Sequence, residues 1–283
     1  MSRCILITGC SSGIGFAMAR EFHRLGHTVY ATARRVEALS VLAAEGLKTL
    51  PMDVNSDESI ASAIDVITRE QGHLDVLVNN AGFSQVGAIT DLTREDLQRQ
   101  YETNVIAPVA VTRAALPLLR RAVAREQSGG RAVLVNVGSI VGLLTTPFAG
   151  AYCSSKAAIH SLSDALRMEL APFGIRVVTV QPGGVKSSFG EHAEAALRLP
   201  ADSMYKPVEN GIHARAQAGQ VGATPAEEFV VPVVAAILAA EPPVVIRGGR
   251  NSIKLPLLKR WLPTRLFDAK MSKAFGLDLL KSR

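Results

Sequence analysis

A tyrosine and a lysine four residues apart are the side chains best suited to chemistry in this sequence. Tyr152 and Lys156 stand at the head of an amphipathic stretch, so on a helix both lie on one face and address one ligand. A phenol with a pKa of about 10 is a poor acid or base at neutral pH, but a nearby ammonium stabilises the phenolate. We therefore expect Lys156 to bring the pKa of Tyr152 toward the working range. The same pair is common on ordinary helices, so its surroundings decide the case.

A serine upstream supplies a third polar group. Ser139 follows a β-branched run at residues 132–137. Its hydroxyl can bond a carbonyl oxygen together with Tyr152 and stabilise the negative charge that develops as a hydride arrives. A serine in a turn is otherwise simply a turn residue. From these residues alone, both roles of Ser139 remain open.

A glycine-rich turn near the amino terminus predicts a phosphate site. The run is Thr8-Gly9-Cys10-Ser11-Ser12-Gly13-Ile14-Gly15. Glycines let a ligand approach the backbone, and the free N–H groups of a helix start attract an anion, so we expect a pyrophosphate there. The spacing is G-x-x-x-G-x-G, which a merely tight turn would also explain. The G-x-S-x-G around Ser11 is typical of α/β-hydrolases, but the eight residues before Gly9 leave no earlier strand for an oxyanion donor.

The second predicted strand runs into two arginines, Arg34 and Arg35. Folds that bind NAD usually place a carboxylate at this point, on the adenosine ribose. A carboxylate would repel a 2′-phosphate, whereas a guanidinium forms charge-assisted bonds with one. Arg34 therefore predicts NADP as the cofactor. The alternative is that both arginines are solvated residues at a helix start.

The alternation of strands and helices predicts how these residues are positioned. Strand-like runs lie at residues 4–8, 28–33, 47–52, 76–79, 132–137, 175–180 and 244–246, and helical stretches at 14–25, 57–70, 94–125 and 154–171. Nearly continuous apolar strands separated by helices indicate a parallel sheet covered on both faces. We predict an α/β fold, a doubly wound Rossmann sheet of about seven strands, with ligands beyond the carboxyl ends of the strands.

One dinucleotide-binding and catalytic domain is predicted for residues 1–250. Within it, residues 184–222 are too long and too irregular for an ordinary connection, which predicts a substrate lid. Its apolar side chains either line a pocket or pack the lid on the body: Phe189, Leu197, Leu199, Met204 and Tyr205. No basic cluster in the lid calls for an acidic substrate. Thr224 is then predicted to cap a helix that has Pro225 in its first position.

A basic amphipathic extension is predicted for residues 251–283. The net charge is +6, and ten basic side chains against two acidic ones from Arg247 onward give +8, leaving −2 for the rest. A slightly acidic body argues against nucleic-acid binding. The extension packs on the body or on a partner subunit, or it lies on an anionic membrane surface. Pro256 and Pro263 are expected to break it into shorter helices.

Composition predicts a globular, cytoplasmic protein. The chain has 283 residues, of which 48% are hydrophobic and 20% charged. Its three cysteines, Cys4, Cys10 and Cys153, form no close pair and support neither a disulfide framework nor a metal site. The first predicted strand leaves no residues for a secretory signal, and the longest apolar run, 229–240, is too short to span a bilayer. Membrane association through the extension is the alternative.

The ordered set of motifs resembles the short-chain dehydrogenase/reductase family, almost throughout the chain up to about residue 245. Besides the glycine turn, the matching motifs are Asp53-Val54, Asn79-Asn80-Ala81-Gly82, Asn104, Gly138-Ser139, Tyr152-Cys153-Ser154-Ser155-Lys156 and Pro182-Gly183. The resemblance implies a catalytic set of Asn104, Ser139, Tyr152 and Lys156. Asn104 would hold a water that links Lys156 to solvent.

The resemblance also implies a cofactor site. Its candidates are Thr8, Gly9, Ser11, Ser12, Gly13, Ile14, Gly15, Arg34, Asp53, Val54, Asn80, Ala81, Gly82, Tyr152, Lys156, Pro182, Gly183, Val185 and Ser187. Asp53 would accept from the adenine amino group, Lys156 would bond the nicotinamide ribose, and residues 182–187 would hold the carboxamide. Ser187 stands where many relatives have threonine, which keeps the hydroxyl but not the rigidity.

The predicted function is an NADP(H)-dependent oxidoreductase that interconverts a carbonyl and an alcohol on a largely apolar substrate of steroid, retinoid or aliphatic type. Tyr152 is the general acid/base. The alternatives are the same chemistry with NAD and a catalytically idle dinucleotide sensor. Residues 29–34 and the extension resemble the steroid and retinoid dehydrogenases and their bacterial aldehyde-reducing relatives. The family further implies a homodimer or homotetramer, paired through the helices at 94–125 and 154–171.

Overall fold

Seven parallel strands form one sheet, which confirms the predicted fold class. The computed structural model describes residues 2–125 and 131–282. The strands are β1 (Cys4–Ile7), β2 (Thr28–Ala33), β3 (Lys48–Pro51), β4 (Val76–Asn79), β5 (Ala132–Val137), β6 (Ile175–Pro182) and β7 (Val245–Gly248). They lie in the order β3-β2-β1-β4-β5-β6-β7, so the order reverses between β1 and β4. Ligands of doubly wound folds bind at such a reversal.

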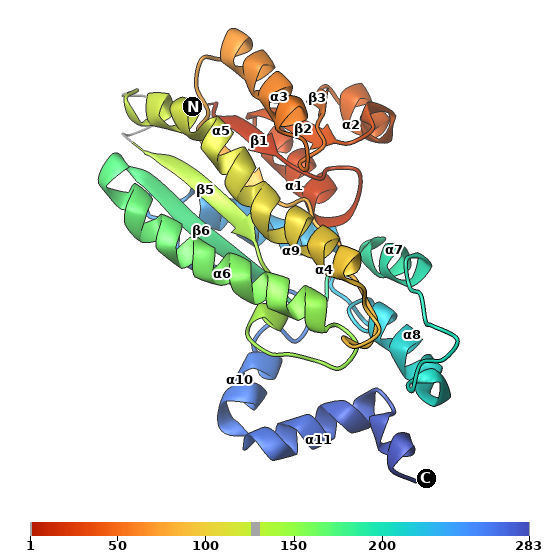
Figure 1. Cartoon of the computed structure of the whole chain (residues 1–283). Helices are drawn as coiled ribbons and strands as arrows, with labels where there is room; N and C mark the ends of the chain where they lie inside the picture. The colour runs from red at the N-terminus through yellow and green to blue at the C-terminus, as the bar shows by residue number, and fades with distance from the viewer. Residues whose placement is uncertain (1, 126–130, 283) are drawn as a thin grey trace.

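Helices cover both faces of the sheet (Figure 1). On one face lie α1 (Gly13–Arg24) and α9 (Ala226–Leu238), and on the other α3 (Asp57–Glu70), α5 (Ala107–Val123) and α6 (Gly150–Leu170). Successive side chains of β1 alternate between the two cores, as the pleat requires: Ile5 and Ile7 join the first, Cys4 and Leu6 the second. Burial on both faces explains why the central strands β1 and β4 are buried at every position and almost entirely apolar.

The predicted helix at residues 94–125 is interrupted. The structure has α4 (Arg94–Tyr101), a π-helical turn at Glu102–Ile106, and α5. Pro108 explains the interruption: it has no N–H to donate to the Asn104 carbonyl, and its ring crowds that carbonyl. The helix widens by one residue there, and Asn104 lies within the widened turn.

Shorter helices complete the chain: α2 (Ser40–Ala44), α7 (Phe189–Ala195), α8 (Glu209–Gln217), α10 (Lys254–Trp261) and α11 (Thr264–Ala274). α7 and α8 belong to the predicted lid, and the extension forms α10 and α11 beyond the start of α6 (Figure 1). No helix within residues 2–125 and 131–282 is both long and apolar enough to cross a membrane.

Two local predictions are wrong. Pro256 does not break a helix, because it lies in the first turn of α10, where a missing N–H costs no hydrogen bond; the break falls at Pro263. Thr224 does not cap α9, whose N-cap is Pro225. The backbone of Thr224 is instead engaged with the segment after β6, donating to the Gly184 carbonyl and accepting from the Lys186 N–H.

Candidate active site

The loops after β1 and β4 are joined at the reversal of strand order. The Thr8 hydroxyl oxygen accepts the backbone N–H groups of Asn80 and Ala81, both at 3.0 Å. The Asn80 side-chain amide donates to the carbonyls of Thr8 and Gly9, both at 2.9 Å. These bonds fix the glycine-rich turn against the 79–82 loop, so the two predicted cofactor segments share one edge of the sheet.

The turn at residues 9–15 leaves no room for a side chain at Gly9 or Gly13. It leads into a helix whose first residues have no side-chain cap. Gly9 and Gly13 have φ angles of 72° and 59°. A Cβ on Gly9 would lie 2.7 Å from Ala81 Cα, and one on Gly13 would lie 2.7 Å from Ser187 Cβ. Ser12, the N-cap of α1, makes no side-chain capping bond to the helix. A helix start with free N–H groups at a close backbone approach fits the pyrophosphate of a dinucleotide.

The adenine-side candidates lie at the ends of β2 and β3. Arg34 is the first residue after β2 and is exposed, with no ion pair to any residue in the described part of the chain. Asp53 is half-buried, and its carboxylate accepts the Asn55 N–H at 3.0 Å. Val54 beside it is buried. These three lie apart from the residues around Tyr152, as the two ends of an extended dinucleotide require.

Ser139, Tyr152 and Lys156 are brought together, as predicted. Ser139 follows β5 and begins a short 3₁₀ turn, where its hydroxyl interacts with the Tyr152 phenol. Lys156 Nζ lies 5.8 Å from the Tyr152 ring centroid and donates to the Val137 carbonyl at 2.8 Å. α6 begins at Gly150, earlier than predicted, so both side chains lie in its first two turns.

Burial opposes ionisation of the tyrosine. Burial raises the pKa of Tyr152 to about 12, and the Ser139 hydroxyl and the Arg215 guanidinium act in the opposite direction. Burial lowers the pKa of Lys156 to about 8. Ser139 and Arg215 therefore ease ionisation of the phenol in this structure, and the contribution expected of Lys156, whose Nζ lies 5.8 Å from the ring centroid, stays a prediction.

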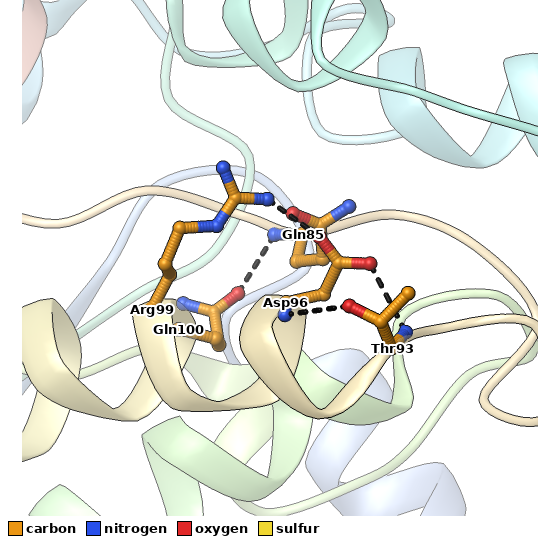
Figure 2. A network of polar contacts seen from close by, with 5 residues as sticks. All are labelled: Gln85, Thr93, Asp96, Arg99 and Gln100. Atoms are coloured by element: carbon orange, nitrogen blue, oxygen red, sulfur yellow. Dashed lines mark hydrogen bonds and ion pairs between the residues drawn. The ribbon is translucent and has the colours of Figure 1, made fainter.

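Two side-chain amides from neighbouring helical turns hold the loop after β4. Asn104 accepts the Phe83 N–H at 3.1 Å and donates to the Phe83 carbonyl at 3.0 Å. Gln100, one turn earlier, accepts the Gln85 N–H at 2.7 Å (Figure 2) and also donates to the Phe83 carbonyl. A Cβ on Gly82 would lie 3.0 Å from Asn104 Oδ1 and 3.8 Å from Lys156 Nζ. Asn104 also donates to the Ser155 hydroxyl at 3.1 Å, so it lies beside the catalytic candidates of α6. Gln100, which sequence reasoning missed, holds the same loop as Asn104.

His160 is a second missed residue. It lies one turn after Lys156, and its Nε2 accepts the backbone N–H of Ser139 at 3.4 Å. Its ring fits only because residues 138 and 142 are glycines: a Cβ at either position would collide with it. Burial, and then the Lys156 charge, lowers the pKa of His160 to about 4, so it is neutral near pH 7 and positions Ser139 without charge. Its i+4 spacing from Lys156 was the available signal.

The segment after β6 approaches the same site. Pro182 ends β6, Gly183 donates its N–H to the Gly248 carbonyl at 2.8 Å, and Val185 is buried. Ser187 donates its N–H to the Gln220 side chain at 2.9 Å. The next residue, Ser188, donates its hydroxyl to Ser12 at 2.9 Å, so this segment reaches the glycine turn.

The five apolar lid residues lie in three different environments: the active site, an apolar cluster and the solvent-exposed surface. Phe189 faces the active site, with its ring centroid 5.5 Å from that of Tyr152. Leu197, Leu199 and Tyr205 pack with Phe148 in a third apolar cluster, which includes side chains of the extension. Met204 is 72% exposed, so the prediction that it lines a pocket is wrong.

Comparison with known proteins decides the family. The sequence model of the family described as short chain dehydrogenase matches residues 3–197. The chain belongs to this family. The short-chain dehydrogenase is therefore an oxidoreductase, and the family binds a nicotinamide dinucleotide.

Individual relatives agree along most of the chain. A short-chain dehydrogenase/reductase of Pestalotiopsis microspora is 32% identical over 286 residues, which cover 99% of this chain and 97% of that protein. The NADPH-dependent 1-acyldihydroxyacetone phosphate reductase of Schizosaccharomyces pombe is 34% identical over 277 residues, 95% of this chain and 86% of that one. The crystal structure of a short-chain dehydrogenase from Streptomyces avermitilis is 28% identical, with a TM-score of 0.78 over 98% of this chain and 97% of that one.

Proposed function

We propose that this short-chain dehydrogenase interconverts a carbonyl and an alcohol, with Tyr152 as the general acid/base. The observation that carries the proposal is the meeting of the Ser139 and Tyr152 hydroxyls with the Lys156 ammonium 5.8 Å from the Tyr152 ring. In the reducing direction, a bound reduced nicotinamide supplies the hydride. Ser139 holds the carbonyl oxygen, and Tyr152 gives that oxygen its proton, so one hydride and one proton make the alcohol.

Lys156 and its neighbours support the tyrosine. Lys156 bonds the nicotinamide ribose in this proposal, and its charge stabilises the phenolate that remains after proton transfer. Asn104 holds a water that restores the proton from solvent. His160 and Gln100 are positioning residues, because they bond the backbone beside the reacting groups.

NADP(H) is the proposed cofactor. Arg34 stands exposed at the end of β2 and forms no ion pair in the described part of the chain, which favours a 2′-phosphate. The relative from Schizosaccharomyces pombe, which is named an NADPH-dependent reductase, supports the same choice of cofactor. Asp53, Asn80 and Ser187 complete the site as proposed contacts of the adenine and carboxamide ends.

The proposed substrate is largely apolar. Phe189 beside Tyr152 and the apolar cluster around Phe148 and Tyr205 give the lid, residues 184–222, an apolar inner surface. Aliphatic, steroid and retinoid carbonyl compounds all meet this description.

We further propose that residues 1–250 are one catalytic domain, that residues 251–283 pack on it, and that the cytoplasmic protein is a homodimer or homotetramer. Phe267 of α11 is only 1% exposed, and the ammonium of Lys259 lies 4.9 Å from its ring centroid. A cavity of about 360 Å³ separates these residues from Cys153 at the start of α6. Trp261 on the outer side is 78% exposed, so liposome sedimentation with and without the extension tests the membrane alternative.

The decisive experiment measures NADPH consumption against aldehydes, ketosteroids, retinal and acyl thioesters. On the best substrate, Tyr152→Phe is expected to lower kcat/KM by about 100-fold or more while nucleotide binding persists. Tyr101→Phe, which removes a phenol from α4, serves as the control. A Tyr152→Phe enzyme within a few fold of the parent would overturn the proposal.

The cofactor assignment has its own test. Arg34→Asp is expected to weaken NADPH binding by about 10-fold or more and to favour NADH, because a carboxylate repels the 2′-phosphate and accepts ribose hydroxyls. Arg35→Asp, one residue along, is the matched comparison. An unchanged preference in the first variant removes Arg34 from the site.

A further inference from the structure

A mostly buried arginine of the lid contacts the loop that joins Ser139 to Tyr152. Arg215 of α8 is 9% exposed, and its Nε donates to the Thr146 hydroxyl at 2.6 Å. Within residues 2–125 and 131–282, no Asp or Glu forms an ion pair with it. The two carboxylates of α7 and α8 nearest in sequence are engaged elsewhere: Glu194 with Gln217 and His213, Glu209 with Lys206.

The position of Arg215 links it to the reaction. Thr146 belongs to the loop between Ser139 and Tyr152, so the arginine contacts the segment that carries both proposed catalytic hydroxyls. Its positive charge also acts on the phenol: it favours a lower pKa of Tyr152, against the larger effect of burial, which raises that pKa. Around it, Ile212 and Ala216 of the same helix pack in the apolar cluster of Phe148. A cation therefore lies next to an apolar cluster and is bonded to the loop that precedes Tyr152.

Such a charge calls for an anion. A guanidinium that is largely withdrawn from water is stabilised when an opposite charge and further hydrogen bonds meet it. One of five guanidinium donors is bonded to Thr146, which leaves the two terminal nitrogens as a planar fork. That fork matches the two oxygens of a carboxylate or a phosphate.

We propose that Arg215 binds an oxyanion of the substrate, so that the substrate is an amphiphile with an acidic group at Arg215 and its carbonyl at Tyr152. This inference rests on the proposed function and narrows its substrate class. The sequence showed no basic cluster in residues 184–222, because the four basic side chains there, Lys186, Arg198, Lys206 and Arg215, are spread along the segment; only the fold brings Arg215 to the loop that precedes Tyr152. The competing explanation is a structural role, in which the bond between Arg215 and Thr146 only holds α8 to the 143–149 loop.

Matched pairs of substrates separate the two explanations. The first series is ω-oxo fatty acids of increasing chain length, each assayed beside its methyl ester; the second is keto-alkyl phosphate monoesters beside the corresponding alcohols. The parent is expected to prefer the acidic member at one chain length. Arg215→Gln is expected to lower kcat/KM by about 10- to 100-fold for that acid, mostly through KM, and by less than about 3-fold for its neutral partner. The two series tell a carboxylate from a phosphate.

Two further variants keep the inference falsifiable. Arg215→Lys retains the charge and is expected to restore part of the preference for the acid. Thr146→Val removes the bond to Arg215 but keeps the guanidinium, so it is expected to preserve that preference. Equal losses on acid and neutral partner in Arg215→Gln, or no preference in the parent, overturn the inference while Tyr152-dependent turnover upholds the proposed function. If no compound is turned over, binding of the same pairs to the NADPH complex of Tyr152→Phe gives the answer.

Discussion

Replacing Lys156 by methionine is expected to stabilise the nucleotide-free protein while abolishing its activity. Lys156 is 6% exposed and pairs with no carboxylate in the described part of the chain. Burial lowers its pKa from 10.5 to about 8, which corresponds to about 3 kcal/mol of unfolding free energy lost at pH 7. Methionine removes that cost but leaves the Val137 carbonyl without its donor, at about 1–2 kcal/mol. The net gain is about 1–2 kcal/mol.

The gain depends on pH in a defined direction. Since the pKa of Lys156 is depressed by folding, the parent bears the whole cost below about pH 8. The cost shrinks as the pH rises from about 8 through 10.5, above which the amine is neutral in both states. Urea unfolding at pH 7 and pH 10 therefore tests the reasoning: the advantage of Lys156→Met at pH 7 is expected to be lost or reversed at pH 10.

An exposed lysine provides the control. Lys270→Met in α11 changes the same side chain at the surface and is expected to leave the unfolding free energy within about 0.5 kcal/mol of the parent. The reasoning is refuted if Lys156→Met is less stable than the parent at pH 7 and the difference is the same at pH 10.

Three further predictions concern the turn and the groups around Ser139. Ser139→Ala removes a hydroxyl that lowers the pKa of Tyr152, so kcat/KM is expected to fall by about 100-fold and its alkaline limb to move to higher pH; coincident pH profiles would contradict this. The pKa of His160 is depressed to about 4, so the parent is expected to lose about 3 kcal/mol of stability as the pH falls from 6.5 to 4; parallel unfolding curves for parent and His160→Gln would exclude it. Gly9→Ala is expected to cost about 1–3 kcal/mol more than Gly26→Ala, since both have positive φ but only Gly9 faces a close neighbour; equal melting temperatures would show that the close approach is tolerated.

The sheet and the reacting groups could be predicted because their signals are local. The apolar runs that became β1 and β5 are buried on both faces, and such strands need no alternation to be recognised. The four-residue spacing of Tyr152 and Lys156 places both on one helix face wherever the helix lies. The role of Gly9 in the turn could be predicted for the same reason, because the positive φ that requires a glycine is a property of the turn itself.

What could not be predicted depends on contacts between distant segments. Gln100 matters because the loop after β4 lies against α4, and His160 because Gly138 and Gly142 meet its ring. Arg215 looks like any helical arginine until α8 is folded over the 143–149 loop. The prediction that Thr224 caps α9 was wrong because the backbone of Thr224 bonds to the segment after β6. Here a contact between distant segments overrides the local capping preference.

The reversal of strand order also separates two kinds of change that evolution or a designer can make. Arg34 and Asp53 follow β2 and β3 on one side of the reversal, while Tyr152 and Arg215 belong to segments that follow β5 and β6 on the other. The residues proposed to choose between NAD and NADP thus follow different strands from those proposed to contact the substrate. Substitutions that change the preference between NAD and NADP are therefore expected to leave the substrate range unchanged, and substitutions that change the substrate range are expected to leave that preference unchanged.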